Sequence, residues 1–147
     1  MTAPVLASSV EADLNAAVLT ALRSDSSLAL LFGDPARIID DESTRAVFPF
    51  VQLEHWQSEP SDTSGRRGLA LTATFVVLSR HGGRSQSRAL VGALRASLDA
   101  LELDLPGQKL VLVQTVFSDV VRGADLRHFR GVVRVRFLTQ ALISPTA

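Results

Sequence analysis

Apolar residues near the start of the chain recur at the spacing of one helix face: Val10, Leu14, Val18 and Leu22. Ser8 precedes this stripe and is followed three residues later by Glu11, which is the pattern of a capping box. The spacing predicts a helix from about Ser9 to Arg23. Leu28 to Phe32 then predicts a further turn or two, ended by Gly33-Asp34-Pro35.

Two extended segments follow this helical region. Arg37-Ile38-Ile39-Asp40 predicts a turn into a strand that begins at Pro49 and runs to Trp56, and a proline is tolerated at the first residue of a strand. A second strand is predicted from Leu69 to Arg80. The twelve residues between them, Gln57 to Gly68, are rich in Ser, Asp, Gly and Arg. We expect them to form a long, mobile hairpin loop, because this composition has little apolar surface to bury.

A second amphipathic helix is predicted after Gly82-Gly83, where Ser85 or Ser87 can serve as the N-cap. Five apolar residues share one face of it, while Arg88, Arg95 and Asp99 share another; the apolar set is Leu90, Val91, Leu94, Leu98 and Leu101. Pro106-Gly107 is expected to close it. Two more strands are predicted, Lys109 to Phe117 and His128 to about Leu142.

The resulting order is helix, strand, strand, helix, strand, strand. It predicts an α+β fold, with a four-stranded and mainly antiparallel sheet, two helices packed on one face, and a long loop between the first two strands. A chain of 147 residues suits a single domain over residues 1–147, for which we expect flexible ends at about 1–7 and 143–147.

The alternation within the strands predicts which residues face the helices. In the last strand Val133, Val135 and Phe137 point inward, which turns Arg134, Arg136 and Leu138 outward. In the second strand the inward set is Leu71, Ala73, Phe75 and Val77, and the outward set is Thr72, Thr74, Val76 and Leu78. The Lys109 strand is apolar on both sides. The outer face is therefore only partly suited to water, which predicts self-association or a partner.

Charge is partitioned along the chain although the net charge is zero. Residues 1–62 hold three basic and ten acidic side chains, whereas residues 63–147 hold twelve basic and five acidic ones, so the halves carry −7 and +7. Pairing of the two halves within one fold is the interpretation we favour. The alternative is that oppositely charged surfaces meet between neighbouring copies.

Composition excludes several classes of function. The chain has no cysteine and therefore no disulfide, thiolate nucleophile or cysteine-based zinc site. It has neither a basic and apolar leader nor the roughly 18 consecutive apolar residues of a membrane span, so synthesis in the cytoplasm and no membrane partner are expected. Zero net charge and few aromatic residues argue against sequence-specific reading of nucleic acid.

No residue is predicted to be catalytic or to bind a cofactor or metal. His55, His81 and His128 lie on three separate segments, whereas zinc needs three or four converging ligands. The turn from His81 to Ser85 could hold a phosphate at a helix N-terminus, but it lacks the Lys-Ser/Thr ending of a P-loop. A plain turn is the favoured interpretation, and a small phosphate-binding enzyme is kept as an alternative. A toxin-like or regulatory module has no positive sign in the sequence.

Seven residues are candidates for a protein interface. Arg66 and Arg67 lie in the predicted loop, and Trp56 at its mouth could anchor either the hairpin or a partner. The remaining candidates are Arg122 and Arg127 near the last hairpin, and Arg134 and Arg136 on the outer face. We expect the predicted loop, with Trp56, to contact a partner.

The order of these elements from about Leu14 to Gln140 resembles the tail-completion (tail terminator) proteins of long-tailed phages and phage-derived gene transfer agents. The segments that carry the resemblance are Arg37-Ile38-Ile39-Asp40, Ala46 to Leu53, Gly82-Gly83 and Arg130-Gly-Val-Val-Arg-Val-Arg-Phe137. The resemblance implies a structural particle protein without catalytic residues.

The same resemblance implies partners and a location. It implies a homo-oligomer, a hexameric ring on the tail tube protein, which ends tube polymerisation and offers a surface to a head-side connector or stopper protein. DNA would pass through the lumen without being read. The protein would move from the cytoplasm to the neck of the particle. A head-side neck component, such as a stopper, is the alternative among structural proteins.

Overall fold

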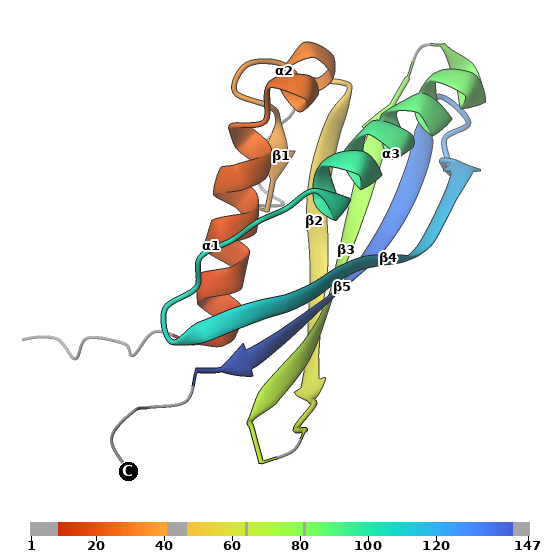
Figure 1. Ribbon diagram of the computed structural model, residues 1–147. Coiled ribbons are helices and arrows are strands. Elements are labelled where there is room, and N and C mark those ends of the chain that lie inside the picture. The colour runs from red at the N-terminus through yellow and green to blue at the C-terminus, as the bar shows by residue number, and fades with distance from the viewer. Residues whose placement is uncertain (1–8, 41–46, 64, 81, 143–147) are drawn as a thin grey trace, which may run out of the picture.

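Five strands form one sheet in the order β1-β2-β3-β5-β4, covered on one side by helices (Figure 1). The computed structural model describes residues 9–40, 47–63, 65–80 and 82–142. Strand β1 is parallel to β2, and the other neighbours are antiparallel. The elements are α1 (Val10–Arg23), α2 (Ser26–Phe32), β1 (Ile38–Ile39), β2 (Phe50–Pro60), β3 (Gly68–Ser79), α3 (Gly83–Asp99), β4 (Gln108–Arg122) and β5 (Phe129–Ala141).

The α+β class is as predicted, but the described residues contain one strand and one helix more than predicted. Strand β1 has only two residues, Ile38 and Ile39, which is too short for an alternating pattern to show. Helix α2 is a separate helix because Asp25 caps it, accepting the backbone N–H groups of Ser27 and Leu28 at 2.8 and 3.1 Å.

The N-cap of α1 is Ser9, whose hydroxyl accepts the N–H of Ala12 at 3.1 Å. The predicted cap, Ser8, lies outside the described residues, as do the ends for which flexibility was expected. Helix α1 then buries three residues of the predicted stripe, Leu14, Val18 and Leu22. The N-terminal stripe therefore predicted the helix well, one residue away from its observed start.

The core lies between the sheet and the helices. All inward residues predicted for the second and last strands are fully buried, which confirms the register of β3 and β5: Leu71, Ala73, Phe75, Val77, Val133, Val135 and Phe137. Val76 and Leu78 point to the outer face as predicted, yet they are also buried. On this face Arg130 of β5 reaches across β3 to Glu54 of β2 at 3.1 Å.

The prediction of a twelve-residue loop from Gln57 to Gly68 is wrong. Strand β2 continues to Pro60 and β3 begins at Gly68, so the turn is confined to residues 61–67. Within it the N–H of Ser61 donates to the carbonyl of Gly68 at 2.9 Å, and Asp62 accepts the N–H of Gly68 at 2.9 Å. Strand β5 pairs with β3 down to Gly68 and so keeps the first residues of β3 in place. Residues 57–60 pair with this part of β3 and thereby extend β2.

Helix α3 also departs from the prediction at both ends. Its N-cap is Gly82, in left-handed backbone (φ 82°), and neither predicted cap serine takes that place. Ser87 lies inside the helix, buried, with its hydroxyl 3.0 Å from that of Ser79 in β3. The helix ends at Asp99 rather than at Pro106-Gly107. Strands β4 and β5 are as expected in position, although β4 extends five residues farther, to Arg122.

Candidate functional site

Strand β4 forms one lateral edge of the sheet and exposes apolar side chains. On its free side no strand of the described chain pairs with it. Its half-exposed apolar residues are Val111, Leu112, Val116, Phe117 and Val121. A long apolar edge strand is a surface that another chain can cover.

A groove runs between this edge and α3. It has a volume of about 320 Å³ and is lined by Arg88, Gly92 and Arg95 of α3 and by Ser118 to Val120 of β4. Both arginines are exposed, and Asp119 is the acidic residue of the lining. Gly92 leaves the floor open, since a β-carbon there would meet no atom within 4 Å. The groove is therefore positively charged and accessible.

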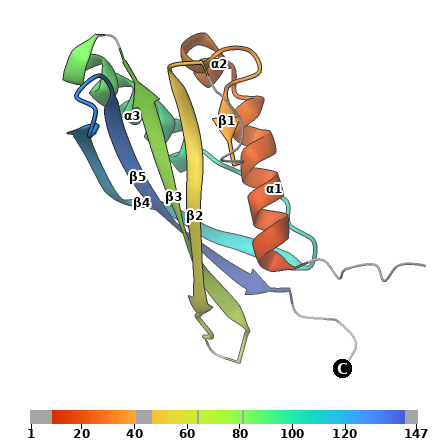
Figure 2. The ribbon, with the colours of Figure 1, turned by 180° about the vertical axis from the view of Figure 1, so that it is seen from behind.

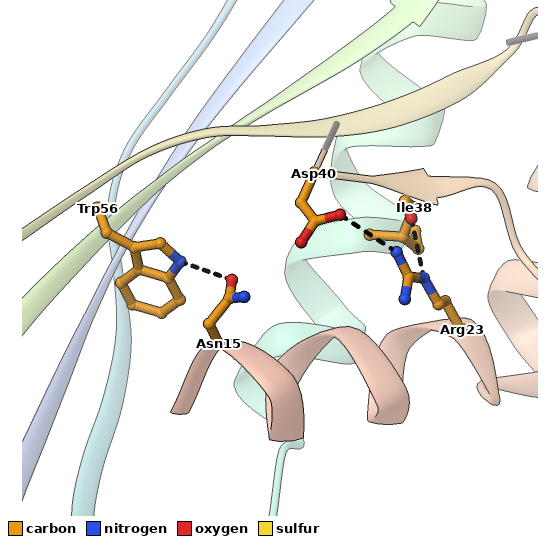
Figure 3. Close-up of polar contacts among 5 residues, drawn as sticks. All are labelled: Asn15, Arg23, Ile38, Asp40 and Trp56. Carbon is orange, nitrogen blue, oxygen red and sulfur yellow. Dashed lines mark hydrogen bonds and ion pairs between the residues drawn. The ribbon is translucent and has the colours of Figure 1, made fainter. Parts of the chain in front are cut away.

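The opposite lateral side is formed by α1, α2 and β1 (Figures 1 and 2). Here Leu30 of α2 is 88% exposed and Leu31 is 41% exposed. Acidic residues lie nearby, Asp34 after α2 and Asp40 after β1. Arg23 at the end of α1 donates to the carbonyl of Ile38 at 3.0 Å and pairs with Asp40 at 3.7 Å (Figure 3), which fixes β1 against α1.

Trp56 lies within β2 and not at the mouth of a loop. Its indole N–H donates to Asn15 of α1 at 3.0 Å (Figure 3), and its ring centroid is 5.5 Å from that of Phe137. The side chain is partly buried against the core. This geometry favours the anchor of the hairpin, one of the two roles considered for Trp56.

Arg66 and Arg67 lie exposed at the β2–β3 turn. The turn is held by its own backbone, since Thr63 and Arg66 exchange hydrogen bonds, and by Ala141 of β5, whose N–H donates to the carbonyl of Arg67 at 2.8 Å. The two guanidinium groups therefore stand on an ordered hairpin tip. Substitution of the two arginines therefore tests their role without removing the backbone that holds the turn.

Arg122 and Arg127 lie at the other end of the sheet, beside the β4–β5 turn. Asp125 accepts the N–H of Arg127 at 2.9 Å and pairs with the His128 imidazole at 2.7 Å. The backbone N–H of Arg127, followed by the contact with His128, lowers the pKa of Asp125 from its ordinary value. Leu126 is 69% exposed on left-handed backbone with φ 61°, a conformation unfavourable for leucine.

Arg134 and Arg136 point outward from β5, as predicted, and both are exposed. The guanidinium of Arg134 lies 5.1 Å from the ring centroid of Phe117 in β4, within the range of a cation–π contact. The structure thus distributes the arginine candidates over three places: the hairpin tip, the opposite end, and the outer face that continues the β4 edge. It does not gather them into one site.

The β4 edge, the α3–β4 groove and the exposed leucines of α2 were not among the sequence candidates. The sequence did place Arg88 and Arg95 on one helix face, but only the strand order reveals that this face borders a free sheet edge. In the described ranges no group of three or more His, Asp or Glu side chains could hold a metal, and no helix is long and apolar enough to cross a membrane. His81 of the glycine turn lies outside those ranges.

Comparison with known families places these surfaces in context. Residues 16–140 match the family described as Tail completion protein gp17. The chain belongs to this family. The match spans most of the chain and confirms the family expected from the order of elements. This tail-completion protein is a structural component of a phage or phage-like particle.

A solved structure shows the same fold. A chain titled "Virion of native gene transfer agent (GTA) particle" superposes with a TM-score of 0.79 at 20% sequence identity, covering 92% of this chain and 100% of that one. The comparison with curated proteins finds none that matches. The likeness in fold therefore covers most of this chain.

Proposed function

We propose that this tail-completion protein forms a ring that caps the tail tube, stops its polymerisation and presents a surface for joining the head. The single observation that carries the proposal is the β4 edge. In a member of a tail-completion family, a fifteen-residue edge strand with five half-exposed apolar residues is a surface for another protein chain. The hexameric ring suggested by the family resemblance supplies such a neighbour in every copy.

The two ends of the sheet are suited to two different partners. The first and last of the twelve residues of β3 are eleven steps of about 3.3 Å apart, so its ends are separated by roughly 36 Å. Arg66 and Arg67 lie in the β2–β3 turn at one end of the sheet. At the opposite end Arg122 is the last residue of β4, and Arg127 lies in the β4–β5 turn. Figure 1 shows these two ends of the sheet. With the strands running along the ring axis, we assign the hairpin tip to the tail tube protein and the β4–β5 turn to the head-side connector.

The outer sheet face is assigned to contacts between copies. Arg134 and Arg136 stand there beside the half-exposed Phe117 and Leu112 of β4. DNA passes through the lumen without sequence recognition in this arrangement. The protein acts in the cytoplasm during assembly and afterwards at the junction of head and tail.

A head-side stopper remains the alternative, and the partner at each end decides between the two. The experiment is to tag the protein at Ala147, image labelled particles, and cross-link purified particles. The proposal expects label at the head–tail junction and cross-links from the hairpin tip to the tube protein. Cross-links to head-side proteins from both ends, with none to the tube protein, would identify a stopper instead.

A further inference from the structure

The exposed apolar side chains of the subunit gather on two opposite lateral sides. Among the described residues, every exposed large apolar side chain except Leu126 and Leu142 belongs either to β4 or to the region of α2 and β1. The second group contains Leu30, Leu31 and Val47. Each side therefore has an apolar patch of its own.

These two sides also carry opposite charge. The segment from 10 to 40, with α1, α2 and β1, holds five acidic and two basic residues, and the segment from 83 to 141, with α3, β4 and β5, holds five acidic and nine basic residues. The sheet order places β1 and β4 at opposite edges. The elements at the two edges of the sheet therefore differ in net charge, and Arg88 and Arg95 place part of the positive charge at the α3–β4 groove.

Among the described residues, an ion pair joins the two halves of the sequence. This pair is Arg130–Glu54, whereas the ion pair Arg23–Asp40 and the contact of Asp125 with His128 each lie within one half. Arg88 and Arg95 line an open groove, with Asp119 as the acidic residue of its lining. The alternative interpretation of the sequence, that the charges meet between copies, fits this arrangement better.

From this complementarity we infer that the α2 side of one copy docks on the α3–β4 side of the next copy. Leu30 and Leu31 then cover apolar residues of the β4 edge, and Asp34 faces Arg88 and Arg95 across the groove. The contact joins two different surfaces, so it is head-to-tail and closes into a ring when the rotation between copies divides a full turn. This inference rests on the proposed ring and names the surfaces that form it.

Cysteine cross-linking tests the contact directly, because the chain contains no native cysteine. The test variant combines Leu30→Cys with Val116→Cys of the β4 edge, two exposed positions that the proposed contact brings together. On oxidation of assembled particles we expect a ladder of covalent multimers of this chain. The matched controls are each single variant and the pair Leu30→Cys with Arg66→Cys, which should give no ladder.

The outcomes separate this inference from the proposed function. Particles that contain the doubly substituted protein at the neck but give no ladder overturn the docking surfaces and leave the ring untouched. If the protein is absent from the neck altogether, the proposed function is contradicted. A ladder formed by the purified chain alone would then still support the docking of the α2 side on the α3–β4 side.

Charge reversal gives a second and independent test. Arg88→Glu with Arg95→Glu should lower incorporation into particles by about tenfold or more, since like charges would face Asp34 across the contact. Asp34→Arg in the same chain should restore part of the loss. Unchanged incorporation of the reversed variant, with its fold verified by circular dichroism, would contradict the inference.

Discussion

Gly131 of β5 and Val91 of α3 pack so closely that a β-carbon on the glycine would overlap the Cγ2 methyl of Val91. Val77 of β3 borders the same point. Because a valine in a helix has one strongly preferred rotamer, the methyl cannot easily move aside. The absence of a side chain at residue 131 is what lets α3 lie against the sheet.

Replacing Gly131 with alanine should therefore lower the free energy of unfolding by about 1–3 kcal/mol, the usual cost of overfilling a packed core. Urea unfolding followed by circular dichroism measures it. The matched control is Gly92→Ala in α3, where the new methyl meets no atom within 4 Å and should raise stability by about 0.5–1 kcal/mol. Equal effects of the two substitutions would contradict the packing described.

Trp56 should behave as an anchor of the fold. Trp56→Phe removes the hydrogen bond to Asn15 but keeps an aromatic ring near Phe137, so we expect a loss of about 1 kcal/mol in the free energy of unfolding. Asn15→Ala should cost a similar amount, and the double variant should cost less than the sum. If Trp56→Phe leaves stability unchanged and abolishes assembly, Trp56 is an interface residue instead.

The two arginines of the hairpin tip should act in assembly and not in folding. Their turn is held by backbone groups, so Arg66→Ser with Arg67→Ser should change the free energy of unfolding by less than about 0.5 kcal/mol. Binding to tail tubes, measured by co-sedimentation with the cognate tube protein, should fall sharply. Arg122→Ser with Arg127→Ser is the control at the opposite end, and it should leave tube binding intact.

Charge reversal at Arg134 and Arg136 tests whether the outer sheet face takes part in the contact between copies. Arg134→Glu with Arg136→Glu should weaken ring formation, since both side chains are exposed and Arg134 covers the half-exposed Phe117. Native mass spectrometry of rings released from purified tails measures the number of copies of this chain in each ring. Rings that form normally with both reversals would exclude this face from the contact.

The fold was predictable wherever a segment carried a long, regular pattern. The alternation of Val133, Val135 and Phe137 fixed the inward face of β5, and the stripe through Leu14, Val18 and Leu22 predicted α1. The same rules missed β1, because Ile38 and Ile39 are stabilised by a parallel neighbour and not by a pattern of their own.

Elements whose conformation depends on tertiary contacts were predicted less well. Ser58 and Glu59 look like loop residues, but pairing with β3 draws them into a strand. Ser87 looks like a helix cap, but its hydroxyl meets Ser79 in the core. The β4 edge could not be identified from sequence, because nothing local records that β5 lies between β3 and β4.

The length distribution of tails tests the central claim most directly. In cells that lack this protein, electron microscopy should show tubes of uncontrolled length without heads, and restoring the intact chain should return a single length and joined particles. Tails of normal length in its absence would contradict the assignment as the protein that caps the tube.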